Sequence, residues 1–321
     1  MKAAVVRRLC GPSCLEYADV AEPASNDLVV IDVGAAGVCH PDLLLISGRY
    51  QWKPDPPFIP GNEVAGTVRS APPGSEFAVG QRVSACPMLG GYAERVAVPA
   101  AYVVKSPPDL DDASASCLLA NYYTAYYTLV HRGGLQAGAT VLVFGSAGGI
   151  GTATVQVAKA LGARVIAMVQ RRQAIRFVES LGADAVLLLD HGWTTQVRRC
   201  TAGRGVDVVV DQVGGGVSGA ALDVITPGGR LLVLGFASGE GIPSFRLDRL
   251  RDRNVDIVGV NSTDFVDRVR EGRTSLQAAI AGLVKAGLRP PVPEVFPLSD
   301  ARYALERLAR GEVFGKAVLV P

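Results

Sequence analysis

The sequence predicts an α/β protein with two domains, a mostly antiparallel β domain and a doubly wound parallel sheet. Three observations indicate this fold class. The chain has 321 residues, which fits about two domains. The apolar pattern changes near residue 120, and a glycine-rich turn follows the first continuous apolar run. We expect residues 1–119 and 261–321 to form the first domain and residues 120–260 to form the second.

The N-terminal part of the chain contains short alternating runs, among them EVAGTVRS and YAERVAVP. Proline and glycine pairs separate these runs, which is typical of strands joined by turns. The pattern predicts a compact, mostly antiparallel β domain.

Six nearly continuous apolar runs follow between residues 120 and 260: VLVFG, RVIAMV, AVLLL, VDVVVDQV, RLLVLGF and VDIVGV. Such runs are expected where helices cover both faces of a parallel sheet. They predict six strands of a doubly wound domain.

The C-terminal segment contains two helical stretches, LQAAIAGLVKAG and ARYALERLARG, and two strand-like segments, EVFPLSD and GKAVLVP. About sixty residues form a poor domain on their own. We therefore expect the segment to return to the first domain and complete its sheet.

The composition excludes several classes of protein. Hydrophobic residues make up 49% of the chain and charged residues 19%, and the mean hydropathy is +0.26, so an extended disordered chain is excluded. The apolar runs are shorter than the roughly 18 residues of a membrane span. A net charge of +2 is too small for a dedicated nucleic-acid binder.

The N-terminal residues and the cysteines indicate the compartment. The segment MKAAVVRRLCGPS has too short an apolar stretch for a signal peptide, so we expect a cytoplasmic protein. The six cysteines lack paired CxxC motifs and the density of a secreted disulfide framework, and we expect free thiols.

A glycine-rich turn, GSAGGIG, follows the apolar run VLVF and opens the helical stretch TATVQVAKALG. The strand RVIAMV follows within about thirty residues, which is the context of a dinucleotide site. Glycines let the backbone approach a pyrophosphate, and the helix N-terminus presents unpaired N–H groups. The expected cofactor contacts are Gly145, Ser146, Gly148, Gly149, Ile150 and Gly151.

The end of the second strand indicates which dinucleotide binds. An NAD site usually has Asp or Glu there for the ribose 2′-hydroxyl, whereas this chain has Gln170, Arg171 and Arg172. Two guanidinium groups can bind a 2′-phosphate through charge-assisted hydrogen bonds. The sequence therefore favours NADP(H), the alternative being that both arginines are simply solvated.

Further cofactor contacts follow from the geometry of parallel sheets, because ligands lie beyond the carboxyl ends of the strands. The residues that follow the fourth and fifth strands are Gln212, Val213, Gly235, Phe236, Ala237 and Ser238. We expect them near the ribose and nicotinamide.

The order of the domains, with PFIPGNEVAGTV, VLVFGSAGGIG, GGRLLVLGF and GKAVLVP, resembles the zinc-independent quinone oxidoreductase branch of the medium-chain dehydrogenase/reductase superfamily. The resemblance covers essentially the whole chain. It implies a GroES-like catalytic domain, a Rossmann domain and a homodimer. In the dimer the run VDIVGV would pair with its twin, which hides an apolar edge.

The resemblance also bears on metal binding. Zinc members hold the metal with a Cys, the His of a PGHE motif and a second Cys before the nucleotide domain. This chain keeps Cys39 but has Asn62 and Ala120 at or near the other positions, which do not complete the set that Zn²⁺ prefers. We expect no metal. One alternative set stays open, Cys39 with His40 and Glu63.

Without a metal there is no Lewis acid to activate an alcohol, so we expect NADPH to reduce a quinone or an α,β-unsaturated carbonyl. The resemblance places Cys39, Asp42 and Tyr50 over the nicotinamide, although many members have Asn in place of Cys39. The alternative for Asp42 is a helix cap, and for Tyr50 an aromatic wall. The resemblance also implies that Asn121 and Thr124 contact the nicotinamide side of the cofactor; the alternative is that they cap a helix. It implies that Lys316 contacts a phosphate; the alternative is a lysine on the surface.

Three other functions stay open. An enoyl-thioester reductase of the same fold would need a tyrosine acid, for which Tyr50 is available. A zinc alcohol dehydrogenase is disfavoured by the missing ligands. An NADPH-binding regulatory or RNA-binding protein is disfavoured by the nearly neutral charge. The expected partner is a small-molecule electron acceptor.

Overall fold

The computed structural model describes residues 1–24, 27–241, 243–262 and 272–321. The chain divides into two compact units, the first comprising Met1–Ala120 with Pro290–Pro321 and the second Asn121–Arg289. One unit is built on a mostly antiparallel sheet and the other on a parallel sheet, so the predicted α/β fold class is confirmed.

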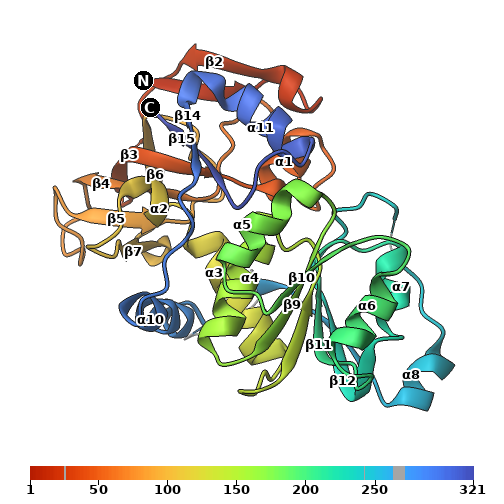
Figure 1. Ribbon diagram of the computed structural model, residues 1–321. Coiled ribbons are helices and arrows are strands. Elements are labelled where there is room, and N and C mark those ends of the chain that lie inside the picture. Colours follow the sequence, from red (N-terminus) through yellow and green to blue (C-terminus); the bar gives the residue numbers. More distant parts are fainter. Residues whose placement is uncertain (25–26, 242, 263–271) are drawn as a thin grey trace. The chain divides into compact units, whose positions relative to one another are not determined.

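The first unit contains a seven-stranded sheet with the order β14-β15-β3-β4-β5-β7, and β6 also pairs with β3. All pairs are antiparallel except β14 with β15. Figure 1 shows the blue C-terminal strands beside β3, so the C-terminal segment completes this sheet as predicted. The seven strands are β3 (Val29–Val38), β4 (Val64–Ser70), β5 (Arg82–Ala85), β6 (Arg95–Val98), β7 (Val103–Lys105), β14 (Glu294–Pro297) and β15 (Ala317–Val320). Strands β1 (Lys2–Val6) and β2 (Leu15–Asp19) form a separate antiparallel pair in the same unit.

Short helices connect these strands, and one longer helix covers the core. The helices of this unit are η1 (Pro12–Cys14), α1 (His40–Ile46), η2 (Ala100–Tyr102), α2 (Asp112–Ala115), η5 (Leu298–Asp300) and α11 (Ala301–Ala309). Helix α11 buries Ala301, Ala304 and Leu305, which share one apolar core with residues of β3 and β4. The apolar stripe of α11 has helical spacing, and this explains why ARYALERLARG folds as a helix on the sheet.

The second unit contains a six-stranded sheet with the order β10-β9-β8-β11-β12-β13, and every pair is parallel. The six runs predicted as strands form it. The strands are β8 (Thr140–Val143), β9 (Arg164–Val169), β10 (Ala185–Leu188), β11 (Val206–Asp211), β12 (Ile225–Val233) and β13 (Asp256–Gly259). The chain reverses its direction of winding between β8 and β11, where doubly wound sheets bind their ligands.

Helices follow most of these strands, and Figure 1 shows them alternating with the strands along the chain. Two helices, α3 (Leu119–Tyr126) and the π-helix η3 (Tyr127–Arg132), precede β8. The others are α4 (Gly149–Ala160), η4 (Arg172–Ala174), α5 (Ile175–Ser180), α6 (Trp193–Cys200), α7 (Gly216–Ala221), α8 (Leu247–Arg253) and α10 (Gly272–Lys285). Within the described ranges, no helix is long and apolar enough to cross a membrane.

The structure corrects the predicted second boundary between the domains. The described residues 261–262 and 272–289 belong to the second unit, whereas the sequence suggested that they return to the first; the rest of that stretch lies outside the described residues. Helix α10 buries Leu276, Ile280 and Val284, and such a stripe shows only that the helix packs on something apolar. After the helix, the Gln156 amide of α4 donates to the Arg289 carbonyl at 3.0 Å, which ties the segment to the second unit.

The structure also corrects the prediction that all six cysteines are free thiols. Cys10 and Cys14 form a disulfide, with their Cα atoms 5.8 Å apart. The turn η1 begins directly after Gly11, whose φ is +84°, and brings these two cysteines within the usual Cα distance of a disulfide. The remaining cysteines are free thiols: Cys39, Cys86, Cys117 and Cys200.

Candidate active site

The glycine-rich turn lies between β8 and α4, as the sequence predicts. Gly145 has φ +63°, a conformation that suits glycine. A Cβ on Gly151 would lie 2.2 Å from the Gly145 carbonyl oxygen, so only glycine allows the helix to approach the strand this closely. Helix α4 has no side-chain cap and no acidic residue in its first turn. The N–H groups at its N-terminus are therefore suited to a phosphate.

Ser146 has a different role from the one predicted. Its hydroxyl donates to the Val143 carbonyl at 2.8 Å and accepts the Met168 N–H at 3.1 Å. Its own N–H donates to the Met168 carbonyl at 3.1 Å. Because both donors are used inside the sheet and the residue is buried, Ser146 ties β8 to β9 and has no donor left for a phosphate.

The loops after β11 and β12 are bonded to each other, which brings together the residues predicted there. The Ala237 N–H donates to the Gln212 carbonyl at 3.1 Å, and the Ser238 N–H donates to the Val213 carbonyl at 2.8 Å. The Gln212 side-chain amide also donates to the carbonyls of Phe144 and Gly145, at 2.9 and 3.0 Å. Gln212 therefore connects this loop pair to the glycine-rich turn.

A depression of about 330 Å³ lies at the same edge of the sheet. It is lined by Gly215, Gly216, Gly219, Glu240, Gly241, Pro243 and Ser244. The first three of these residues follow β11, just after the predicted Val213, and the others follow β12, just after the predicted Ser238. The predicted Phe236 is 43% exposed. In sequence, the residues that line the depression therefore come directly after the predicted cofactor contacts in both loops.

Asn121 lies against the N-terminus of α4, because a Cβ on Gly149 would be 2.7 Å from its side-chain nitrogen. The structure therefore brings Asn121 to the glycine-rich turn. The Thr124 hydroxyl is instead 2.9 Å from that of Ser262. That bond links α3 to the segment after β13. It is not the helix cap that the sequence analysis gave as the alternative, because Thr124 lies inside α3, and a cofactor contact of Thr124 stays a prediction.

The residues predicted to choose the dinucleotide follow β9 directly. Gln170, Arg171 and Arg172 are all exposed. The first carboxylate after the strand is Glu179, so no acidic side chain occupies the usual position of the NAD-binding residue.

In the first unit, Cys39 lies at the start of α1 and Asp42 caps that helix. The Asp42 carboxylate accepts the Cys39 N–H at 3.0 Å and the Tyr92 hydroxyl at 2.9 Å. Burial raises the pKa of Asp42 to about 6, although both of these bonds lower it. Asp42 is only 2% exposed. These contacts match the alternative that the sequence analysis left open, a helix-cap carboxylate.

Tyr50 is half-buried and packs on the apolar core of the first unit. Burial and the nearby Asp42 charge raise the pKa of its phenol. Among the described residues, none forms a hydrogen bond with its hydroxyl. The Tyr50 ring therefore packs on the core, as the alternative of an aromatic wall predicts, and its hydroxyl is available to a ligand.

Lys316 is buried in the first unit, so the alternative of a surface position is wrong, and the phosphate contact stays a prediction. Its ammonium donates to the Glu63 carboxylate and to the Cys39 sulfur, each at 2.9 Å. The second Glu63 oxygen accepts the Ala120 N–H at 3.0 Å. We call Cys39, Glu63 and Lys316 the Lys316 cluster. A phosphate contact would require this buried ion pair to break.

Sequence reasoning missed two buried polar residues. Tyr92 supplies the hydroxyl that Asp42 accepts, and no pattern around it indicated this. Asp211 is fully buried at the end of β11, where it accepts the N–H groups of Val213 and Gly214 at 2.9 Å each. An acid that ends an otherwise apolar run was the signal for Asp211.

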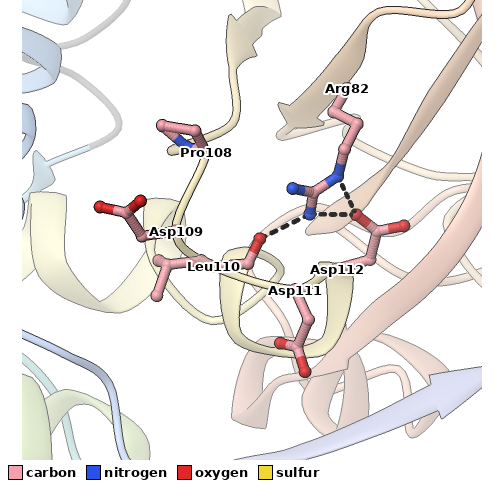
Figure 2. Close-up of a pocket in the computed structure, with 6 residues that line it drawn as sticks. All are labelled: Arg82, Pro108, Asp109, Leu110, Asp111 and Asp112. Atoms are coloured by element: carbon pink, nitrogen blue, oxygen red, sulfur yellow. Dashed lines mark hydrogen bonds and ion pairs between the residues drawn. The ribbon is translucent and has the colours of Figure 1, made fainter.

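A second depression, of about 480 Å³, lies in the first unit but serves a structural purpose. Figure 2 shows its lining residues, with the Arg82 guanidinium directed at the Asp112 carboxylate and the Leu110 carbonyl. Asp111 caps α2 by accepting the Ser114 N–H at 2.8 Å. These bonds anchor α2. Because the charges of Arg82, Asp111 and Asp112 are already paired, these residues offer no unpaired group to a ligand.

A doubly wound sheet with this turn, joined to a β unit of this topology, defines a dinucleotide-dependent oxidoreductase fold. The family described as zinc-binding dehydrogenase matches residues 149–278, and the alcohol dehydrogenase GroES-like domain matches residues 25–108. The chain belongs to the medium-chain dehydrogenase/reductase superfamily, in its quinone oxidoreductase-like branch.

Three similar proteins illustrate the relationship. A probable oxidoreductase from Mycobacterium abscessus is 49% identical, with a TM-score of 0.93 over 100% of this chain and 99% of its own. The quinone oxidoreductase from Thermus thermophilus, solved also with NADPH, is 33% identical with a TM-score of 0.83 and 100% coverage of both chains. A 2-haloacrylate reductase from Burkholderia sp. is 33% identical over 308 residues, covering 89% of this chain and 85% of its own.

The family raises the question of a catalytic zinc ion, and the residues do not fit one. Cys39 and Glu63 lie together, but a lysine ammonium binds both. Asn62 and Ala120 stand at the remaining positions, and neither is the Cys or His that Zn²⁺ prefers. In the described parts of the chain, no three His, Cys, Asp or Glu side chains are arranged to hold a metal ion. The alternative set with His40 is therefore not assembled.

The buried Asp42 leads to a prediction about pH and stability. Its pKa in the folded chain, about 6, is above its usual 3.8, so folding favours the protonated form. Asp42 therefore lowers the free energy of unfolding as pH rises from about 4 to about 6, by about 3 kcal/mol in total. Asp42→Asn keeps an acceptor for both donors, and we expect this decrease to disappear.

Urea unfolding at several pH values between 4 and 7 measures the effect. Asp19→Asn is the matched control, because Asp19 is exposed and its pKa is lowered rather than raised; this variant should keep the decrease. An Asp42→Asn protein with the same pH dependence as the unmodified chain would contradict the assignment of the raised pKa to Asp42.

Proposed function

We propose that this protein is a zinc-independent reductase that transfers hydride from NADPH to a quinone or an activated α,β-unsaturated carbonyl. The observation that carries the proposal is the Lys316 cluster, in which an ammonium binds the two potential metal ligands that remain, Cys39 and Glu63. Without a Lewis acid, the oxidation of an alcohol is disfavoured. Reduction of an electron-poor acceptor needs less help from the protein.

The chain is an oxidoreductase, and its cofactor is NADP(H). The turn between β8 and α4 provides the pyrophosphate site, and the similar Thermus quinone oxidoreductase was solved with NADPH. We propose that Arg171 and Arg172 bind the 2′-phosphate through charge-assisted hydrogen bonds. Both are exposed after β9, where they are accessible to a ligand.

The two acceptor classes share one chemical property. A quinone and an activated enone each have a carbonyl that stabilises the electrons arriving with the hydride, so the protein chiefly orients the rings and supplies a proton or hydrogen bond. The similar proteins include a quinone oxidoreductase and a 2-haloacrylate reductase, which supports an acceptor of this general type.

The acceptor side of the proposal rests on Tyr50. Its hydroxyl has no hydrogen-bond partner among the described residues, and its pKa is raised, so it is a phenol donor at neutral pH. We propose that Tyr50 donates a hydrogen bond to the acceptor carbonyl. Cys39 and Asp42 are buried and bonded to their neighbours, and we propose that they hold α1 in place rather than contact the acceptor.

A second candidate function is an enoyl-thioester reductase. The same unpartnered Tyr50 hydroxyl favours it, because such an enzyme needs an acid near the nicotinamide. A panel of small quinones and enoyl thioesters distinguishes the two functions by the ratio of their kcat/KM values. A cytoplasmic location remains our expectation.

The reaction is tested with Tyr50→Phe. If the hydroxyl donates to the acceptor, turnover with a small quinone should fall by at least about tenfold, while NADPH affinity measured by fluorescence stays unchanged. The control is Tyr303→Phe, since Tyr303 is half-exposed on α11 and should have no effect. Unchanged kinetics of Tyr50→Phe would remove this residue from the site, and no NADPH oxidation with any quinone or enone would refute the proposed reaction.

Cofactor choice is tested with the double variant Arg171→Ala, Arg172→Ala. Loss of two charge-assisted contacts should weaken NADPH binding by about 100-fold or more and leave NADH binding nearly unchanged. Arg176→Ala is the control, because Arg176 is exposed one turn further on, in α5. Equal loss for both cofactors, or equal affinity of the unmodified chain for both, would contradict the 2′-phosphate assignment.

We also propose a homodimer. Strand β13 is at the edge of the six-stranded sheet, and among the described residues it pairs only with β12. Its run VDIVGV is mostly apolar, so an unpaired edge would favour aggregation. Pairing with β13 of a second copy would satisfy that edge. Light scattering at micromolar concentration should give twice the chain mass of 33.5 kDa, and a mass near that of one chain would exclude the dimer.

A further inference from the structure

The Cys10–Cys14 disulfide closes a small ring in the first unit, with three residues between the two cysteines. Cys10 is exposed and Cys14 is half-buried, whereas the other cysteines are half-buried or buried. An external thiolate attacks an exposed disulfide more readily than a buried one. The most accessible sulfur atom of the chain is therefore in this ring.

The ring is a weak structural crosslink. The stabilisation that a disulfide gives increases with the number of residues in the ring it closes, and this ring is short. The chain also keeps four free thiols, so it is not a disulfide framework of the kind found in small secreted domains. Exposed disulfides outside such frameworks are typically those that are broken and formed again in function.

The ring is bonded to the end of α1. The Gly11 N–H, which belongs to the ring, donates to the Ile46 carbonyl at 3.0 Å. The carbonyls of the last helical turn have no partner within their own helix, so the ring caps the C-terminus of α1. A Cβ on Gly11 would lie 3.5 Å from the Ser47 hydroxyl oxygen. The closed ring therefore lies directly against the end of this helix.

The residues after α1 pack on the same loop. Gly48 has φ +65°, and a Cβ there would lie 3.4 Å from the Cβ atom of Leu9, the residue before Cys10. Leu9 in turn packs on the apolar core of the first unit. Tyr50 follows Gly48 by two residues. The position of residues 46–50 therefore depends on the loop that the disulfide closes.

We propose that the Cys10–Cys14 disulfide is a reversible thiol–disulfide exchange site, opened by a dithiol, and that opening the ring releases residues 46–50 at the end of α1. A thiolate of the dithiol attacks the exposed Cys10 sulfur, the bond between the cysteines breaks, and Cys14 leaves as a thiolate that takes up a proton. The second thiol of the dithiol then displaces Cys10. The cysteines gain two electrons and two protons, and the dithiol becomes a disulfide.

Labelling tests the exchange. Accessible thiols of the oxidised chain are first blocked with iodoacetamide, dithiothreitol is then added, and the new thiols are labelled with N-ethylmaleimide. Peptide mapping should find the second label at Cys10 and Cys14, and oxidised glutathione added before the maleimide should prevent this labelling by closing the ring. A pair that the maleimide does not label, or that glutathione does not protect, would refute the inference.

Hydrogen exchange tests the release of α1. The N–H groups of Gly48 and Arg49 donate to carbonyls of α1, and they should exchange faster after reduction, while β8 of the second unit should be unchanged. Cys10→Ser with Cys14→Ser should exchange fast with and without dithiothreitol. Cys200→Ser is the matched control, because Cys200 is a half-buried free thiol of the second unit, and it should respond as the unmodified chain does. An open ring without faster exchange at residues 46–50 would contradict the inference.

The consequence for catalysis rests on the proposed function, in which the Tyr50 hydroxyl binds the acceptor. The serine double variant replaces the reduced chain here, because a free dithiol reduces quinones directly. Its KM for a small quinone should rise by about threefold or more, since Tyr50 must be ordered on binding, and its NADPH affinity should stay unchanged. An unchanged KM would refute the effect on the acceptor. No NADPH oxidation by either protein would instead refute the proposed function, and labelling and hydrogen exchange would still decide the inference.

Discussion

The buried ion pair between Glu63 and Lys316 is the interaction on which the first unit depends. One Glu63 oxygen accepts the Lys316 ammonium, 253 positions away in sequence, and the other accepts the N–H of Ala120. A single carboxylate therefore holds together the turn before β4, the last strand β15 and the start of α3. Since removing one partner of such a pair leaves an uncompensated buried charge, these three segments are constrained together. The turn at Cys39 is part of the same arrangement, because its sulfur is the second partner of the ammonium.

The second unit positions its loops by a similar principle. Asp211 is fully buried, and its carboxylate accepts two backbone N–H groups and the Ser218 hydroxyl. Gln212, the next residue, reaches the carbonyls at the glycine-rich turn. Buried polar groups that are fully bonded fix one arrangement, because any other leaves a group unsatisfied. These bonds fix the loops at the carboxyl ends of β8, β11 and β12, whereas the arginines after β9 are exposed.

Periodic features of the sequence predicted the fold, and contacts between distant residues escaped it. The six apolar runs and the glycine-rich turn each depend on neighbours in sequence, and the structure has them where expected. Helix α10 has an apolar stripe that would fit either unit, so the sequence did not show which unit it joins. Its predicted assignment to the first unit was wrong. The Cys10–Cys14 disulfide depends on one local turn, and the burial of Lys316 depends on a partner far away. Motif matching identified Cys39 and Asp42, but not that their side chains are already bonded within the fold.

The hydrogen bonds among the buried polar side chains decide which groups of the first unit remain for chemistry. Cys39, Asp42 and Glu63 satisfy one another or their neighbours, so they stabilise the turn and helix. Tyr50 keeps a hydroxyl with no partner in the described chain, and Asn62 keeps a buried oxygen with none. A quinone offers only hydrogen-bond acceptors, which a phenol donor suits and an amide oxygen does not. The Tyr50 hydroxyl is therefore the group of the first unit that matches the proposed acceptor, and the buried Asn62 oxygen is not.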